Sequence, residues 1–289
     1  MVNLKCIALV AMLLTGFMSC EKETTQNPIS SDGPAVSASN RRGASYLGRQ
    51  EIITVPTGDY TYPTSQALLW LPGVYSKEDM EDVCYPLIIA LDGVGENNSD
   101  INSLLHDGTL ATRIANGWNP KARNPLNNRM YKFIVFTPQC PVNWGWSAPH
   151  IKTMLATLKQ TYRIDTTRIY ITGYSAGAWG LWSCITDDES LCSQFAAICP
   201  VSTASADHPD KITNVAKYGI ACWNICGTAD AFYTNAVNYT NIINNANPPV
   251  KAILSSLQGV GHSAWYQAYD TAWRDNGKNF FEWALQYHK

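Results

Sequence analysis

The stretch Arg168–Gly180, "RIYITGYSAGAWG", passes from a β-branched segment directly into glycine and other small residues. One serine, Ser175, stands where the character of the sequence changes. A strand that turns sharply into a helix leaves the residue at the turn exposed and strained, and neighbouring glycines remove the Cβ atoms that would collide there. The stretch therefore predicts a strand, a tight turn and a helix, with the Ser175 hydroxyl at the edge of a sheet.

On both sides of this stretch, apolar β-rich runs alternate with segments of helical spacing. The predicted strands cover residues 67–72, 85–93, 131–139, 168–175, 195–202, 218–227 and 250–257. The predicted helices cover residues 101–117, 148–163, 176–186, 235–246 and 271–289. Several of the runs are apolar on consecutive positions, as expected for strands covered on both faces. The alternation predicts an α/β domain with a mostly parallel central sheet flanked by helices and no large lid domain.

Residues 1–45 precede this domain and have a different character. Lys5 is followed by an apolar run that is too short to span a bilayer, so residues 1–19 are predicted to be a targeting signal. The signal resembles that of a bacterial lipoprotein, in which Cys20 would carry lipid, and plain secretion with cleavage near Ser19 is the alternative. Residues 20–45 are polar and rich in Ser, Pro and Gly, which predicts a flexible tether. The folded domain is expected over residues 46–289.

Charge and cysteine content narrow the classes of function. The net charge of −2 and the scattered Lys and Arg residues exclude a nucleic-acid binder. The cysteines show no zinc-like spacing, so no metal site is expected. Cys184 and Cys192 bracket a short polar segment and are predicted to form a disulfide. Cys222 and Cys226 lie in one strand, too far apart to bridge.

Ser175 needs a base that takes its proton and a carboxylate that orients this base. His262 follows the strand predicted over 250–257 in a glycine-rich loop, and Asp230 follows the strand predicted over 218–227. Both residues come at strand ends, where open α/β sheets bind their ligands. The order Ser175, Asp230, His262 predicts a catalytic triad. The structural alternatives are a serine in a plain turn, an aspartate that caps a helix and a histidine that only packs.

Acyl transfer also needs N–H donors for the negative charge that develops on the carbonyl oxygen. The backbone amide of Ala176, directly after the serine, is one predicted donor. The loop after the strand over 85–93 reads "DGVGENN", and its glycines let the backbone approach a substrate, so the amide of Val94 is the second. A bare turn after a strand would look similar.

These segments, taken together, resemble a known family. "YPLIIALDGVGENN", "FTPQCP", "RIDTTRIYITGYSAGAWGLW", "ICGTAD" and "GVGHSAWYQAY" run in this order through residues 85–269. They resemble the α/β-hydrolase esterases that include feruloyl esterases, acetylxylan esterases and polyhydroxybutyrate depolymerase-like proteins. The resemblance implies the α/β-hydrolase fold, the triad and oxyanion amides named above, and a reaction without a metal or organic cofactor.

These relatives usually have His-Gly where this chain has Asp92-Gly93. An ionised, inward-pointing carboxylate there would weaken anion stabilisation, and the alternative is that Asp92 binds a polar part of the substrate. Aromatic side chains suit a sugar ring or a phenolic acid. The aromatic residues expected to line the cleft are Trp144, Trp146, Trp179 and Trp265. For Trp179, packing in the core is the alternative.

The sequence thus predicts an exported, lipid-anchored serine carboxylic-ester hydrolase that removes feruloyl or acetyl groups from plant cell-wall polysaccharides. A polyester hydrolase, a general carboxylesterase or a peptidase of the same fold is the alternative within enzymes. A glycan-binding lipoprotein that has lost catalysis is the alternative outside them.

Overall fold

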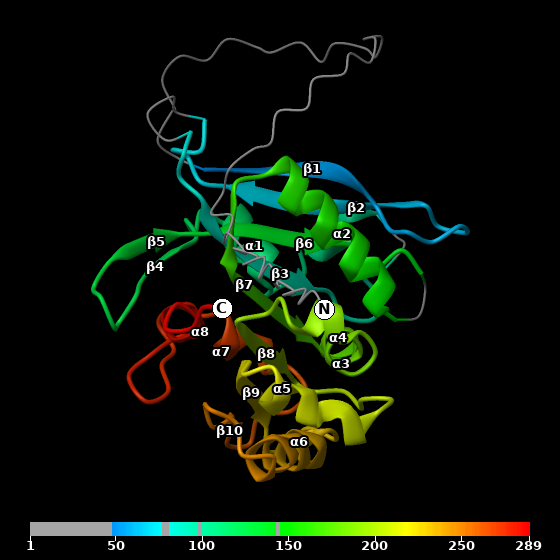
Figure 1. Cartoon of the computed structure of the whole chain (residues 1–289), viewed down its shortest axis with the longest axis vertical. Helices are drawn as coiled ribbons and strands as arrows, with labels where there is room; N and C mark the ends of the chain where they lie inside the picture. The colour runs from blue at the N-terminus through cyan, green and yellow to red at the C-terminus, as the bar shows by residue number, and fades with distance from the viewer. Residues whose placement is uncertain (1–47, 77–80, 98–99, 143–144) are drawn as a thin grey trace, which may run out of the picture.

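The computed structural model describes residues 48–76, 81–97, 100–142 and 145–289. The predicted targeting signal, the predicted lipid-bearing Cys20 and the predicted tether lie outside the described residues. Within them, an eight-stranded sheet of order β1-β2-β6-β3-β7-β8-β9-β10 forms the centre of the molecule (Figure 1). Its strands are β1 Arg49–Pro56, β2 Thr64–Leu71, β3 Tyr85–Leu91, β6 Ile134–Pro138, β7 Ile164–Tyr174, β8 Ala197–Val201, β9 Ala221–Gly227 and β10 Ile253–Leu257.

The sheet is parallel from β6 to β10 and antiparallel at the β1–β2 end. All seven predicted strands are present. The sequence of β3 shows why a continuous apolar run is needed in the centre. Leu87, Ile89 and Leu91 pack into one hydrophobic core, whereas Ile88 and Ala90 pack into a second core on the opposite face.

The helices are divided between these two cores. Side chains of α2 to α6 contribute to the first core, and those of α1, α7 and α8 contribute to the second. The helices are α1 Leu110–Ala115, α2 Ala148–Thr161, α3 Ala176–Thr186, α4 Glu189–Cys192, α5 Asn214–Lys217, α6 Tyr233–Asn245, α7 Trp265–Ala268 and α8 Phe280–Ala284, with short 3₁₀ turns at Ile101–Leu104 and Pro209–Thr213. No helix of the described residues is both long enough and apolar enough to cross a membrane.

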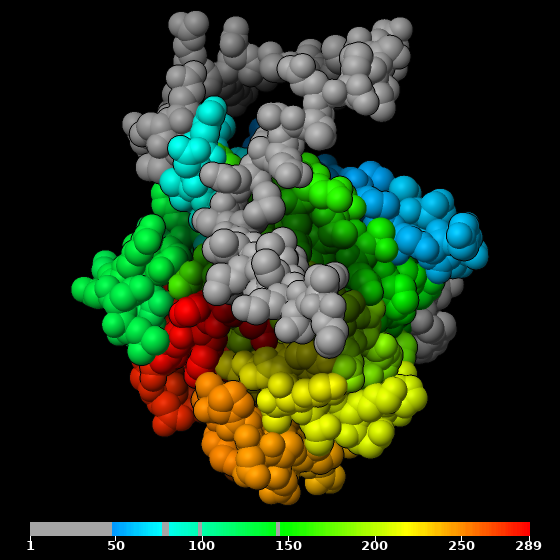
Figure 2. All heavy atoms as spheres, viewed as in Figure 1, coloured from blue at the N-terminus to red at the C-terminus, as the bar shows by residue number. Residues whose placement is uncertain are grey.

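The structure differs from the predicted elements in several places. The edge strand β1 and the strand β4 Lys121–Arg123 were not predicted. The strand predicted over 131–139 is divided between β6 and β5 Met130–Lys132, which pairs with β4 in a small hairpin. Figure 2 shows this hairpin and the turn between β1 and β2 at the margins of the molecule. The helix predicted over 101–117 is split by a loop, and most of the helix predicted over 271–289 is absent. A turn through Asn276 and Gly277, both with positive φ, precedes the short helix α8.

The predicted disulfide between Cys184 and Cys192 is wrong. Both thiols are free and buried in the first core, where α3 packs against α4. The segment between them is a helix end and the short helix α4 rather than a loop, so proximity in sequence brings the two residues into one apolar layer without joining them. Cys222 and Cys226 lie in β9, as predicted, and are also free.

Candidate active site

The ends of four parallel strands bring the predicted residues to one edge of the sheet. Leu91 at the end of β3 pairs with Gly173 near the end of β7, so the chain leaves both strands side by side. Val94 lies three residues after Leu91, and Ala176 lies three residues after Gly173. The next strands in order, β8, β9 and β10, end at the same edge. The loops that carry Asp230 and His262 begin there.

Ser175 occupies the sharp turn between β7 and α3. Its backbone has φ 54° and ψ −118°, a conformation that residues other than glycine rarely adopt. The turn is held because the amides of Ala178 and Trp179 donate to the carbonyl oxygen of Ser175. Close packing of α3 on β3 requires Gly177, since a Cβ atom there would lie 2.3 Å from the carbonyl oxygen of Leu91. The strained turn therefore presents the Ser175 hydroxyl at the sheet edge.

Ser175, His262 and Asp230 form a continuous chain of hydrogen bonds. The distance from His262 Nδ1 to Asp230 Oδ2 is 2.9 Å, and that from His262 Nε2 to Ser175 Oγ is 2.8 Å. A carboxylate has only acceptors, so Nδ1 carries the ring proton and Nε2 is left to accept from the serine hydroxyl. The Asp230 side chain is fully buried and that of His262 is 40% exposed. The buried Asp230 thus orients the imidazole from the interior of the protein, and the exposed part of the ring is accessible to a substrate.

The surroundings of Asp230 fix its carboxylate in place. The amide of Phe232 donates to Oδ1 at 2.9 Å, and the Cys226 thiol donates to Oδ2 at 3.7 Å. Burial raises the pKa of this thiol to about 12, so it remains a donor. The Asp230 loop is joined to the His262 loop because the Ala229 amide donates to the carbonyl oxygen of Val260. Asp230, predicted either to orient the catalytic histidine or to cap a helix, accepts hydrogen bonds from His262 and from its own loop, and the N-cap residue of α6 is Phe232.

Aromatic rings border His262. The Phe232 ring lies 5.6 Å from the imidazole, and the Trp265 ring meets it edge-on at 6.0 Å. The loop after His262 is also fixed to the end of β8, because the amide of Ala264 donates to Ser202 Oγ. Ser202 itself has a positive φ of 46°. The histidine loop is therefore supported from two neighbouring strand ends.

The two predicted oxyanion donors are uncommitted. The amide of Val94 donates to no other residue that the structure describes, and the Val94 side chain is 57% exposed. Ala176 is the first residue of α3, where an amide has no partner within its own helix. Its N-terminal position also places the positive end of the helix dipole beside Ser175. Both amides remain available to an oxygen that develops negative charge.

The predicted substrate contacts have different outcomes. Trp144 lies outside the described residues. The predictions for Trp146 and Asp92 are wrong, because these residues are only 1% and 2% exposed and lie in the interior. The Trp146 indole instead donates to the backbone oxygen of Asp92. Trp179 and Trp265 are half-buried, with the Trp179 ring packed against Gly145 and Trp265 beside His262, and their contact with substrate stays a prediction.

Asp92 begins the oxyanion loop and its side chain is buried, in an environment that favours the neutral form of the carboxyl group. Its carboxyl oxygens have no partner at hydrogen-bond geometry among the described residues, although the Cys140 amide and the Trp146 indole lie near enough to favour the charged form in part. Desolvation is the larger effect and, together with the neighbouring charge of Glu96, raises the pKa of Asp92 well above its usual value. A neutral Asp92 does not oppose an oxyanion.

We expect the replacement Asp92→Asn to change how stability depends on pH. The folded protein keeps a proton on Asp92 that the unfolded chain releases near pH 4, so rising pH removes stability from the wild type and not from the variant. The free energy of unfolding of the variant relative to wild type should rise between pH 4 and the folded-state pKa, at most by about 1.4 kcal/mol per pH unit. Denaturant unfolding from pH 4 to pH 8 measures this difference. A difference that is constant over this range would contradict the prediction.

Several residues that shape the site were not predicted from the sequence. Phe232, Ser202 and Cys226 act through contacts across loops and strands. Tyr174 stands at the variable position before the nucleophile, and Glu96 is the acidic residue of the loop after β3. The available signal was their place at or near strand ends, the region in which open α/β sheets bind their ligands.

Comparison with known proteins relates this arrangement to solved structures. No protein-family model matches the chain, and no curated protein matches it either. A thermostable esterase superposes with a TM-score of 0.63 at 21% identity, covering 83% of this chain and 63% of that chain. The S-formylglutathione hydrolase of Staphylococcus aureus gives 0.56 at 16% identity, with 83% and 98% covered. The chain has the α/β-hydrolase fold.

A feruloyl esterase module from Clostridium thermocellum, complexed with sinapinate, gives a TM-score of 0.52 at 17% identity, with 78% of this chain and 87% of that chain covered. Identities this low establish the fold and do not transfer a substrate. With this fold, the chemistry of the site is indicated by Ser175, Asp230 and His262, which lie after β7, β9 and β10 and are joined by hydrogen bonds.

Proposed function

We propose that the protein is a serine carboxylic-ester hydrolase, and that its substrates are feruloyl or acetyl esters of plant cell-wall polysaccharides. The observation that carries the proposal is the hydrogen-bonded chain from Asp230 through His262 to Ser175. The uncommitted amides of Val94 and Ala176 support it, because acyl transfer needs both a nucleophile and oxyanion donors.

The reaction proceeds through an acyl-enzyme. His262 Nε2 takes the proton of Ser175 as Oγ attacks the ester carbonyl, and the resulting imidazolium is stabilised by the buried carboxylate of Asp230. The oxyanion receives hydrogen bonds from the amides of Val94 and Ala176. As the tetrahedral intermediate collapses, the alcohol leaves with the proton from Nε2. Water then enters, gives its proton to His262 and releases the acid by the same steps.

The substrate class rests on the side chains around the histidine. Phe232 and Trp265 border the imidazole, and the exposed ring of Tyr266 follows Trp265 at 6.1 Å. Flat aromatic faces pack well against a phenolic acid or a sugar ring. Proteins of this fold include feruloyl esterases, which is consistent with such a substrate.

A comparison of esters with the same alcohol tests the substrate. We expect the purified protein to hydrolyse methyl ferulate with a kcat/KM at least about tenfold above that for methyl butyrate, or to release acetate from acetylated xylan. Equal rates on both methyl esters and no action on xylan would favour the general carboxylesterase. If the protein hydrolyses none of these and does not react with a fluorophosphonate, the glycan-binding alternative replaces the enzyme.

Location is a separate proposal. We propose that Cys20 carries a lipid and that residues 20–45 tether the domain outside the cytoplasm, which would hold the enzyme close to a polymeric substrate. Metabolic labelling with a fatty-acid probe tests it. A Cys20→Ala variant that incorporates as much label as wild type would contradict it.

A further inference from the structure

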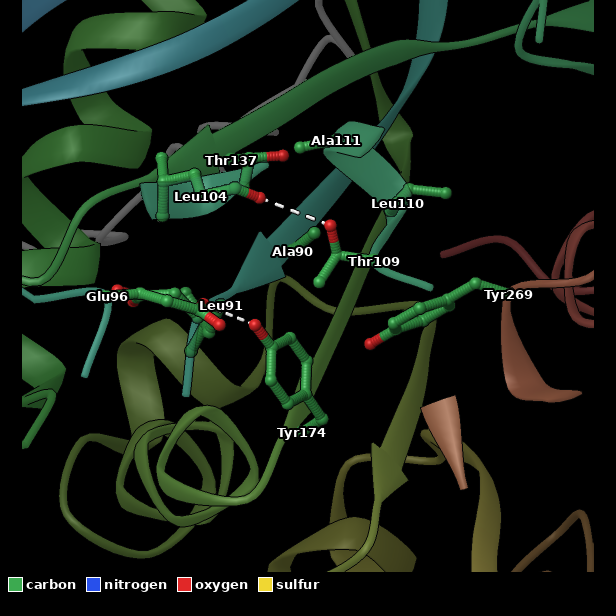
Figure 3. A pocket seen from close by; sticks show the side chains of 11 residues that line it. Ala90, Leu91, Glu96, Leu104, Thr109, Leu110, Ala111, Thr137, Tyr174 and Tyr269 are labelled. Carbon is green, nitrogen blue, oxygen red and sulfur yellow. Dashed lines mark hydrogen bonds between the residues drawn. The ribbon is translucent and has the colours of Figure 1, made fainter. Parts of the chain in front are cut away.

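The loop after β3 is held by a side chain that belongs to the loop itself. Glu96 Oε2 accepts a hydrogen bond from the amide of Gly93 at 3.2 Å and another from the hydroxyl of Tyr174. Figure 3 shows Glu96 and Tyr174 joined in this way beside a small cavity. Because Tyr174 directly precedes Ser175, one carboxyl oxygen links the oxyanion loop to the nucleophile turn.

The loop's backbone hydrogen bonds single out one amide. The Gly93 amide is bonded to Glu96, and the Gly95 amide is bonded to Asn97 Oδ1 at 2.9 Å. Between them, Val94 alone keeps an amide without a partner among the described residues. The side chains that fold back onto the loop thus occupy the flanking donors and leave the central donor for an oxyanion.

Packing fixes the same arrangement. The Gly93 backbone lies against the Tyr174 ring so closely that a Cβ atom would be 2.8 Å from it. The backbone oxygen of Glu96 accepts from Ser103 Oγ at 3.0 Å and from Gln139 Nε2 at 2.7 Å. The loop is therefore held by Ser103, by Gln139 just after β6 and by Tyr174, the last residue of β7. The shared acceptor Glu96 Oε2 is its hydrogen-bonded contact with the nucleophile strand.

We propose that Glu96 is a positioning residue for the oxyanion hole, and that its shared acceptor oxygen holds the Val94 amide in place relative to Ser175. This inference rests on the proposed ester hydrolysis. A shift of about 1 Å in a group that stabilises the transition state lowers a rate by about 10²-fold, which sets the effect that loss of this acceptor should have.

Two conservative variants separate the position of the acceptor from its charge. Glu96→Gln keeps a side chain of the same length with one acceptor oxygen. In the wild type the Gly93 amide and the Tyr174 hydroxyl both donate to the single atom Oε2, so the one amide oxygen of glutamine can accept both hydrogen bonds. Glu96→Asp keeps the charge but withdraws the acceptor by one methylene group. We expect kcat for p-nitrophenyl acetate to fall about 10²-fold in Glu96→Asp and to stay within about fivefold of wild type in Glu96→Gln. KM should change by less than about threefold in both, because the donor acts in the transition state.

A transition-state analogue supplies the second readout. An aryl trifluoromethyl ketone adds to Ser175 and forms an oxyanion, so its inhibition constant should rise in Glu96→Asp by the same factor by which kcat/KM falls. Thr137→Val is the matched control, since Thr137 lines the same cavity and its hydroxyl has no partner among the described residues. Its kcat should equal that of wild type.

The outcomes are distinguishable. An inactive wild type would refute the proposed ester hydrolysis itself. With an active wild type, unchanged kcat in Glu96→Asp would overturn the positioning role, as would a Glu96→Gln variant that is as impaired as Glu96→Asp. Thermal unfolding of each variant shows whether a loss of rate is a loss of folded protein, and a loss explained in this way in both variants would also overturn the proposal.

Discussion

Replacing Ser175 by alanine should lower kcat for ester hydrolysis by roughly 10⁶-fold, the loss that follows when the nucleophile of such a triad is removed. The reason is local. No other hydroxyl in the described residues lies at the sharp turn after β7 with His262 Nε2 at hydrogen-bond distance. The measurement is the initial rate with p-nitrophenyl acetate and with the preferred methyl ester, corrected for spontaneous hydrolysis.

Ser183→Ala is the control for this experiment. Ser183 lies on the same helix α3, and its hydroxyl donates to Asp187 Oδ2 at 2.5 Å, away from the triad. Its activity should match that of wild type. A Ser175→Ala protein that retains more than about 1% of wild-type kcat would show that another group is the nucleophile.

Replacing Asp230 by asparagine should lower kcat by roughly 10⁴-fold, because the imidazole would be trapped in the wrong tautomer. The Phe232 amide donates to Oδ1, so it holds the amide oxygen of the new side chain at that position. The NH₂ group then faces His262 Nδ1 in place of Oδ2 and donates to it. The ring proton moves to Nε2, which is then unable to accept the proton of Ser175.

The asparagine variant also tests the assignment of the acid. Its folded stability, followed by thermal unfolding, should remain close to that of wild type because the side chain keeps its shape and its bond to Phe232. Loss of rate with retained folding is the expected combination. A variant with more than about a tenth of wild-type activity would show that Asp230 only holds its own loop and does not set the tautomer of His262.

The central strands and the nucleophile turn were predictable from sequence because their signals are local. Strands covered on both faces are apolar throughout, and the glycines on either side of Ser175 indicate the sharp turn. The edge strand β1 lacks this signal, since it is half-exposed and its alternation is weak. The last helix was overextended because helical spacing continues on both sides of the turn at Asn276 and Gly277.

The site was predictable to the extent that residue types at strand ends define it. Ser175, Asp230 and His262 each follow a strand, and the structure brings them together. Trp146 and Asp92 also follow strands, but their side chains turn into the interior, and a strand end does not state which way a side chain points. Glu96 acts through a bond to Tyr174 that crosses from one strand end to another, a relation that spacing along the chain does not contain.

The free cysteines make the unfolded protein sensitive to oxidation. Among the described residues, six cysteines carry free, buried thiols: Cys140, Cys184, Cys192, Cys199, Cys222 and Cys226. Desolvation raises the pKa of each of these six thiols, so the folded protein offers almost no thiolate to an oxidant. Unfolding exposes all six at once, and mispaired disulfides then trap the open chain in an oxidising medium. The lifetime of the folded protein in an oxidising medium is therefore set by the rate at which it first unfolds.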